Sequence, residues 1–115
     1  MSAEPALAWS THDFGAAMRA ALAARRMSFR DLESRTLIPV GNLHDHASGK
    51  RAAPGDDLLG RIAGGLGVEP AYFREWRERR LIEALRQVPE LEIALSRRVA
   101  EGRLARTRAT DPEPV

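Results

Sequence analysis

Apolar residues recur every three or four positions along most of the chain, which is the spacing of one face of an α-helix. The first such stripe runs from residue 13 to residue 26, and Ser10 or Thr11 is placed to cap it. Ser28 and Asp31 then have the spacing of a capping box, which predicts a second, short helix. No stretch alternates apolar and polar residues as a strand does, so the pattern predicts an all-α protein.

Proline and glycine divide the next part of the chain. Pro39 is placed to occupy the first position of a third helix, which Gly49 ends. A fourth apolar stripe stops at Gly67, and its last turn contains Gly64 and Gly65. Each glycine costs a helix about 1 kcal/mol relative to alanine, so we expect another helix to approach closely there.

The carboxy-terminal half is predicted to be helical as well. A longer helix runs from residue 71 to about residue 87, and a further helical stretch follows Pro89. The apolar stripe of this half, which extends over both helical stretches, has nothing left to pack against in so small a domain. An exposed stripe of this kind is typical of a surface that binds a partner, and it predicts a homodimer. The expected dimer interface consists of Leu81, Leu85, Val88, Leu91, Leu95 and Val99.

These patterns divide the 115 residues into four parts. Residues 1–10 lack a clear period and are expected to form a flexible arm. Residues 11–70 form the main domain, and residues 71–108 form the carboxy-terminal helices. Residues 109–115 are a polar tail that contains proline.

Composition narrows the class of protein. The net charge is +2, and only one of the 18 basic residues is a lysine, so an argument for nucleic-acid binding depends on where the charges lie. The chain has no cysteine, no signal-peptide pattern and no apolar run long enough for a bilayer, so we expect a soluble, cytoplasmic protein.

Catalytic and metal chemistry find little support in the sequence. There is no nucleotide-binding loop and no nucleophile elbow, so we expect neither an enzyme nor a cofactor. His44, Asp45 and His46 are adjacent, but residues two apart on a helix point to nearly opposite faces. We therefore expect no metal site.

Several short helices, with a break of about three residues between the second and the third, are the layout of a helix-turn-helix domain. From residue 14 to residue 73 the chain resembles the Cro/C1-type (XRE-like) helix-turn-helix DNA-binding family. This resemblance implies a five-helix domain, with residues 28–36 as the second helix and residues 39–47 as the recognition helix. The matching pieces are Phe14-Gly15, Met18-Arg19, Met27-Ser28, Leu32, Ile38, Leu43, Gly49-Lys50-Arg51, Pro54, the run from Arg61 to Val68, and Tyr72-Phe73.

The chain also departs from the family pattern. The family usually has alanine where Glu33 stands and glycine where Leu37 stands, so this turn is either built differently or strained. A pair of opposite charges in the family is replaced by Leu22 and Ala47, and such a joint replacement can leave stability unchanged. His46 stands at a core position, either as a buried histidine with one hydrogen bond or as the source of a pH-sensitive core.

The resemblance also implies which residues contact DNA. The expected base-reading residues are Val40, Gly41, Asn42, His44 and Asp45. Among these side chains, asparagine can read adenine, valine can touch a thymine methyl group, aspartate can accept from cytosine, and histidine can donate to guanine. The expected phosphate contacts are Arg30, Arg35, Lys50 and Arg51, with ordinary solvated charges as the alternative. The arginines between residues 97 and 108 either contact flanking DNA or keep the tail soluble.

The sequence therefore predicts a homodimeric, sequence-specific DNA-binding regulator that represses transcription by occupying promoter or operator DNA. An alternative is a helix-turn-helix fold used as a protein-interaction module or an antitoxin, with a protein partner bound through the carboxy-terminal helices. Val40, Gly41 and Asp45 on the expected recognition helix favour this alternative, because the set of base-reading residues lacks Arg, Lys and Gln.

Overall fold

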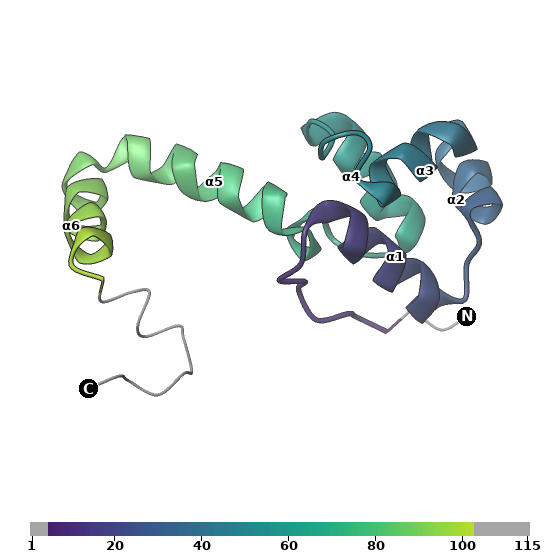
Figure 1. The fold of residues 1–115 in the computed structure, drawn as a ribbon, viewed down its shortest axis with the longest axis horizontal. Helices are drawn as coiled ribbons and strands as arrows, with labels where there is room; N and C mark the ends of the chain where they lie inside the picture. The colour runs from purple at the N-terminus through teal and green to yellow at the C-terminus, as the bar shows by residue number, and fades with distance from the viewer. Residues whose placement is uncertain (1–4, 103–115) are drawn as a thin grey trace. The chain divides into compact units, whose positions relative to one another are not determined.

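The computed structural model describes residues 5–102, in which there are six α-helices, one short 3-10 helix and no strand (Figure 1). The elements are α1 (Phe14–Arg25), α2 (Phe29–Thr36), α3 (Val40–Ser48), α4 (Asp56–Leu66), the 3-10 helix η1 (Pro70–Tyr72), α5 (Arg74–Gln87) and α6 (Pro89–Ala100). The all-α prediction is confirmed over these residues. None of the described helices is long and apolar enough to cross a membrane.

The chain forms two compact units, which divide between Arg79 and Arg80, within α5. The first unit therefore extends beyond the boundary at residue 70 that the sequence suggested. It does so because η1 and Phe73, just ahead of α5, supply buried side chains to its core. Residues 103–108 and the predicted tail, residues 109–115, lie outside the described part of the chain.

Local sequence determines most helix ends. The Ser28 hydroxyl accepts from the Asp31 N–H at 3.0 Å, and the Asp31 carboxylate accepts from the Ser28 N–H at 2.9 Å. This is the predicted capping box, and its hydrogen bonds from Ser28 hold the pKa of Asp31 below its ordinary value. Gly49 and Gly67 adopt the left-handed conformation and end α3 and α4, as predicted.

The cap predicted for α1 is wrong. The Asp13 carboxylate caps this helix by accepting from the Ala16 N–H at 3.0 Å. The hydroxyl of Ser10 instead accepts from the His12 N–H at 3.0 Å, in the segment that precedes the helix. Neither Ser10 nor Thr11 is therefore the cap, because α1 begins later than its apolar pattern suggests.

The segment expected to be a flexible arm has defined contacts over its described part. The Trp9 indole N–H donates to the Glu69 carboxylate at 3.2 Å, and the Ser10 N–H donates to the Tyr72 carbonyl oxygen at 2.9 Å. The Arg77 guanidinium donates to the Ser10 carbonyl oxygen at 2.6 Å and lies 5.4 Å from the centre of the Trp9 ring. These bonds and the cation–π contact hold the segment against η1 and the start of α5, unlike a free arm.

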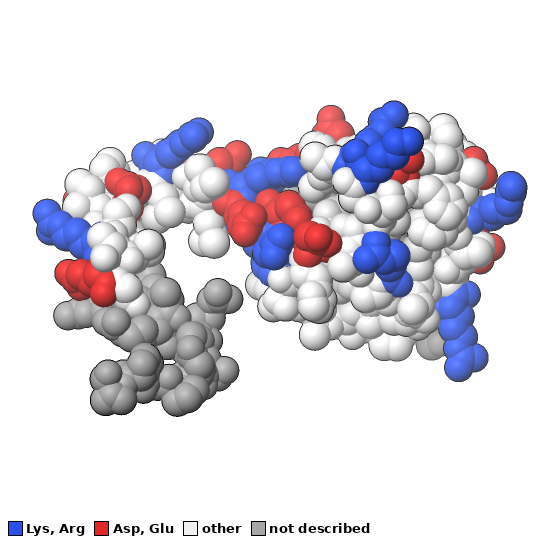
Figure 2. Space-filling model, viewed as in Figure 1, with Lys and Arg blue, Asp and Glu red and all other residues white. Residues whose placement is uncertain are grey.

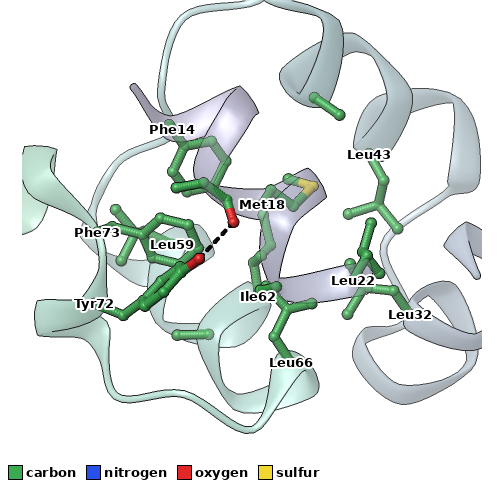
Figure 3. Packing of buried hydrophobic residues seen from close by; sticks show 14 of the residues in the cluster. Phe14, Met18, Leu22, Leu32, Leu43, Leu59, Ile62, Leu66, Tyr72 and Phe73 are labelled. Atoms are coloured by element: carbon green, nitrogen blue, oxygen red, sulfur yellow. Dashed lines mark hydrogen bonds between the residues drawn. The ribbon is translucent and has the colours of Figure 1, made fainter. Parts of the chain in front are cut away.

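The core of the first unit is formed by buried side chains from α1, α2, α3, α4 and η1, with α1 packed against α3 and α4, and α2 packed against the same two helices (Figure 3). The rings of Phe14 and Phe73 pack with their centres 4.5 Å apart. The Tyr72 hydroxyl donates to the Ala17 carbonyl oxygen at 2.8 Å, and burial raises the pKa of Tyr72. The largest fully buried side chains are those of Phe73, Met18, Leu32, Leu43, Leu59, Ile62 and Leu66.

The crossing of α2 and α4 has no room for a side chain at Gly65. A Cβ placed there would lie 2.5 Å from Cγ2 of Thr36 and 2.8 Å from Cδ1 of Leu32. At Gly64 a Cβ would meet nothing within 4 Å. The close approach predicted for this pair of glycines is therefore confirmed at Gly65 and wrong at Gly64.

A similar crossing joins α1 to the carboxyl end of α3. A Cβ on Gly15 would lie 2.6 Å from the Ala47 carbonyl oxygen, so the two backbones are in direct contact. Arg19, one turn further along α1, donates a hydrogen bond to the same carbonyl oxygen. The glycine lets the helices meet, and the arginine supplies the donor that the helix end needs.

Arginine side chains also bind the last carbonyl groups of α2 and α4. Arg61 donates to the Thr36 carbonyl oxygen at 2.6 Å. Arg25 donates to the carbonyl oxygens of Leu66 and Gly67 at 3.0 and 2.8 Å. The final carbonyls of a helix have no partner within the helix, and a cation there also interacts favourably with the helix dipole.

Substitution of the two adjacent glycines tests the crossing of α2 and α4. Gly65→Ala is expected to lower the free energy of unfolding by about 1–3 kcal/mol, because the new methyl group overlaps Thr36 and Leu32. Gly64→Ala adds the same methyl group in open space and is expected to raise the free energy of unfolding by up to about 1 kcal/mol. Urea unfolding followed by circular dichroism measures both, and equal effects would contradict the crossing.

Candidate nucleic-acid interface

A short connection, residues 37–39, joins α2 to α3. Leu37 adopts the left-handed conformation with φ 62°, and its N–H donates to the Glu33 carbonyl oxygen at 2.7 Å. Its side chain is 81% exposed, so packing does not offset the conformational cost. The sequence left two alternatives, a turn that is built differently and a turn that is strained, and the strained turn is the one that occurs.

Glu33, a departure from the family pattern, has a structural role. Its carboxylate accepts from the Val40 N–H at 3.1 Å and so caps α3 from α2. Pro39 was predicted at the first position of the helix but lies one residue earlier, as the N-cap residue. Proline has no side-chain acceptor, and Glu33 supplies the one that it lacks.

The burial of residues along α3 shows which of its faces points outward. Leu43, His46 and Ala47 are buried in the first unit, whereas Gly41 and His44 are exposed. The other residues predicted to read bases, Val40, Asn42 and Asp45, are partly exposed. All five predicted base-reading residues are therefore accessible at least in part.

Two histidines on α3 have different surroundings. His44 stacks on Phe29 of α2, with ring centres 4.0 Å apart and planes 28° apart. His46 is buried, and its Nδ1 lies 2.8 Å from the Ala52 carbonyl oxygen, so Nδ1 carries the hydrogen. The buried histidine with one hydrogen bond is thus found. The sequence did not reveal the role of Phe29, because this contact joins two helices.

The predicted phosphate contacts divide into two pairs. The side chains of Arg30 and Lys50 are exposed and have no polar partner among the described residues. Arg35 donates to the Gly65 carbonyl oxygen at 3.1 Å, near the end of α4. Arg51 forms an ion pair with Asp45, in which Nε lies 3.6 Å from Oδ2. Arg35 and Arg51 therefore have partners within the protein.

Charge is dispersed on the visible face of the first unit. In Figure 2, the Lys and Arg side chains there are separated by neutral surface and by Asp and Glu side chains. An electrostatic interface on this face would therefore depend on single side chains rather than on a continuous basic patch.

Leu22 and Ala47, which stand where the family has a charged pair, are both buried in the core of the first unit. These two positions therefore contribute apolar packing and bury no charge. The link between α1 and the end of α3 is made instead by Arg19, whose guanidinium donates to the Ala47 carbonyl oxygen.

The apolar stripe predicted as a dimer interface lies on α5, α6 and the residue between them. Leu81, Val88, Leu91 and Val99 are exposed, and Leu85 and Leu95 are partly exposed. Neither helix contains a buried residue. Two further apolar residues of these helices, Ile82 and Ile93, are exposed and were not among the six predicted.

The strained turn can be tested by removing its Cβ. Leu37→Gly is expected to raise the free energy of unfolding by about 0.5–1 kcal/mol, because the left-handed penalty exceeds the entropy that glycine adds to the unfolded chain. Leu37→Ala keeps the Cβ and serves as the control, with no gain expected. Urea unfolding of the two variants decides the question, and an equal gain in both would show that the backbone is not strained.

Comparison with known protein families, with curated proteins and with solved structures found no match to this chain. The resemblance of residues 14–73 to a DNA-binding family therefore stays a prediction.

Proposed function

We propose that the chain is a sequence-specific, DNA-binding transcriptional regulator of the Cro/C1-like helix-turn-helix type that acts as a homodimer. One observation supports this proposal most. The short turn after α2 and the cap from Glu33 present the outer face of α3, and two unpartnered cations lie at the ends of this helix pair, Arg30 in the first turn of α2 and Lys50 just after α3. A helix presented in this way can enter the major groove, where base edges are read.

The accessible side chains of α3 supply several kinds of base contact. The Asn42 carboxamide matches the donor and acceptor of an adenine edge, and Val40 suits a thymine methyl group. His44 is held by its stack on Phe29, which reduces the conformational entropy lost on binding. Arg30 and Lys50 then supply phosphate contacts, which position the helix without reading the sequence.

The apolar face of the second unit supplies the proposed contact between two copies. Neither α5 nor α6 buries a residue within the described part of one chain, so their leucines and valines are available to a partner. Helix-turn-helix proteins commonly bind two half-sites as dimers, which makes a second copy the simplest occupant. A dimer that occupies operator DNA excludes other proteins from it, and this is the proposed basis of repression.

A second function is favoured by the contacts of two basic residues. Arg35 and Arg51 already have partners within the chain, and α3 itself contains no Arg, Lys or Gln. The same fold would then act as a protein-interaction module or antitoxin, with its carboxy-terminal helices bound to another protein.

Binding to duplexes at several salt concentrations separates the two functions. Asn42→Ala is expected to cost about 1–3 kcal/mol on the preferred duplex and nothing on other duplexes, because it removes only a base contact. Lys50→Ala is the contrasting variant. It is expected to weaken binding to all duplexes alike and to reduce the slope of log affinity against log salt by about 0.9. A wild type without preference among duplexes, matched by Asn42→Ala at every salt concentration, would favour the interaction module.

The proposed dimer is tested by placing a charge in the stripe. Leu85→Asp or Leu95→Asp is expected to produce monomers in analytical ultracentrifugation, because a buried, unpaired carboxylate opposes association. Ala94→Asp adds the same charge at an exposed position of α6 outside the stripe and serves as a control. The helices of the first unit should persist by circular dichroism in all three variants. A wild type that is monomeric at micromolar concentration would contradict the dimer.

A further inference from the structure

Asp45 is an unexpected residue on the outer face of α3, because a carboxylate that approaches DNA is repelled by the phosphates. The sequence assigned it to accept from a cytosine. In the structure, however, this carboxylate has a partner, since Oδ2 of Asp45 lies 3.6 Å from Nε of Arg51. The Arg51 N–H also donates to the Asp45 carbonyl oxygen at 3.0 Å.

These two contacts hold Arg51 from its backbone and from its side chain. Gly49, in the left-handed conformation, ends α3 and turns the chain so that residue 51 comes back to residue 45. The Arg51 side chain remains 55% exposed, and that of Asp45 is 30% exposed. The guanidinium is therefore oriented by its neighbour and still accessible to a ligand.

The ion pair engages Nε and leaves the rest of the Arg51 guanidinium available. Neither its Nη1 nor its Nη2 atom donates a hydrogen bond to another described residue. Two such nitrogens form a planar fork that matches two neighbouring acceptors, and O6 and N7 of guanine are such a pair in the major groove. Lysine cannot replace this fork, because its ammonium acts as a single point charge.

The surface beside this pair leaves room for a base. Gly41 lies one turn before Asp45 on the same face of α3, and a Cβ built on it would meet nothing within 4 Å. An open position of this kind allows a base edge to come close to the helix backbone.

We propose that Asp45 is a positioning residue rather than a base reader, and that it orients Arg51 to read a guanine through its two Nη atoms. This inference rests on the proposed DNA-binding function and names the specificity of the same site. It also explains how a carboxylate is tolerated there, because Arg51 neutralises it. Arg51 supplies the arginine readout that α3 itself lacks.

Selection from a library of random duplexes, followed by competition binding, tests the assignment. Arg51→Lys keeps the charge and loses the fork, so the preference for G·C at one position should fall by about 5- to 150-fold. Asp45→Asn should lose preference at that same position, because Arg51 is no longer oriented. It should also bind all duplexes more tightly at low salt, since it removes a negative charge. The matched controls, Arg26→Lys and Asp57→Asn, lie at exposed positions outside the proposed interface and should leave the preferred sequence unchanged.

Other outcomes would overturn the assignment. If Arg51→Lys keeps every preference, Arg51 contacts only phosphate. If Asp45→Asn changes the preference at a position that Arg51→Lys leaves intact, Asp45 reads a base itself. In both cases a selective wild type would still uphold the proposed function, whereas a wild type without selectivity would overturn the function as well. Thermal unfolding of each variant confirms that these exposed substitutions leave the fold intact.

Discussion

The carboxyl ends of α2 and α3 are buried against neighbouring helices, and a buried helix end is stable only where its last carbonyl groups find donors. The first unit meets this constraint twice in the same way. On α1, Gly15 permits contact with the end of α3 and Arg19 donates to its carbonyl. On α4, Gly65 permits contact with the end of α2, and Arg61 donates to the last carbonyl of that helix. In each helix the glycine and the arginine are four residues apart and so share one face.

This device also determines how α3 is presented. The carboxyl end of α3 is bound to α1, and its amino end is capped by Glu33 from α2. The face of α3 that these contacts leave uncovered is its outer face. Arginines that a count of charges would assign to DNA also bind helix ends. Arg35, for example, binds the Gly65 carbonyl oxygen, so part of the basic charge of this chain stabilises helix ends.

Sequence reasoning succeeded where a structure depends on neighbours along the chain. The capping box at Ser28 and the stop at Gly49 are local, and both occur as predicted. It failed where a partner comes from another helix. Gly64 and Gly65 are adjacent in the chain, but only Gly65 faces α2. Its close approach to Thr36 and the hydrogen bond that its carbonyl oxygen accepts from Arg35 both depend on how the two helices pack. Of the candidate site, the accessible face of α3 was predictable, whereas the pairing of its charges was not.

The two units differ in how far they depend on a partner. The first has a closed core, whereas α5 and α6, with 14 and 12 residues, contain no buried residue in the described chain. Isolated helices of this length are marginal in water, because nucleation is costly and packing normally supplies most of their stability. The association proposed for these helices would therefore also stabilise them, so that helix formation and dimerisation are coupled. DNA affinity would then depend on protein concentration more steeply than the first unit alone requires, because two half-sites are occupied only after the second unit has paired.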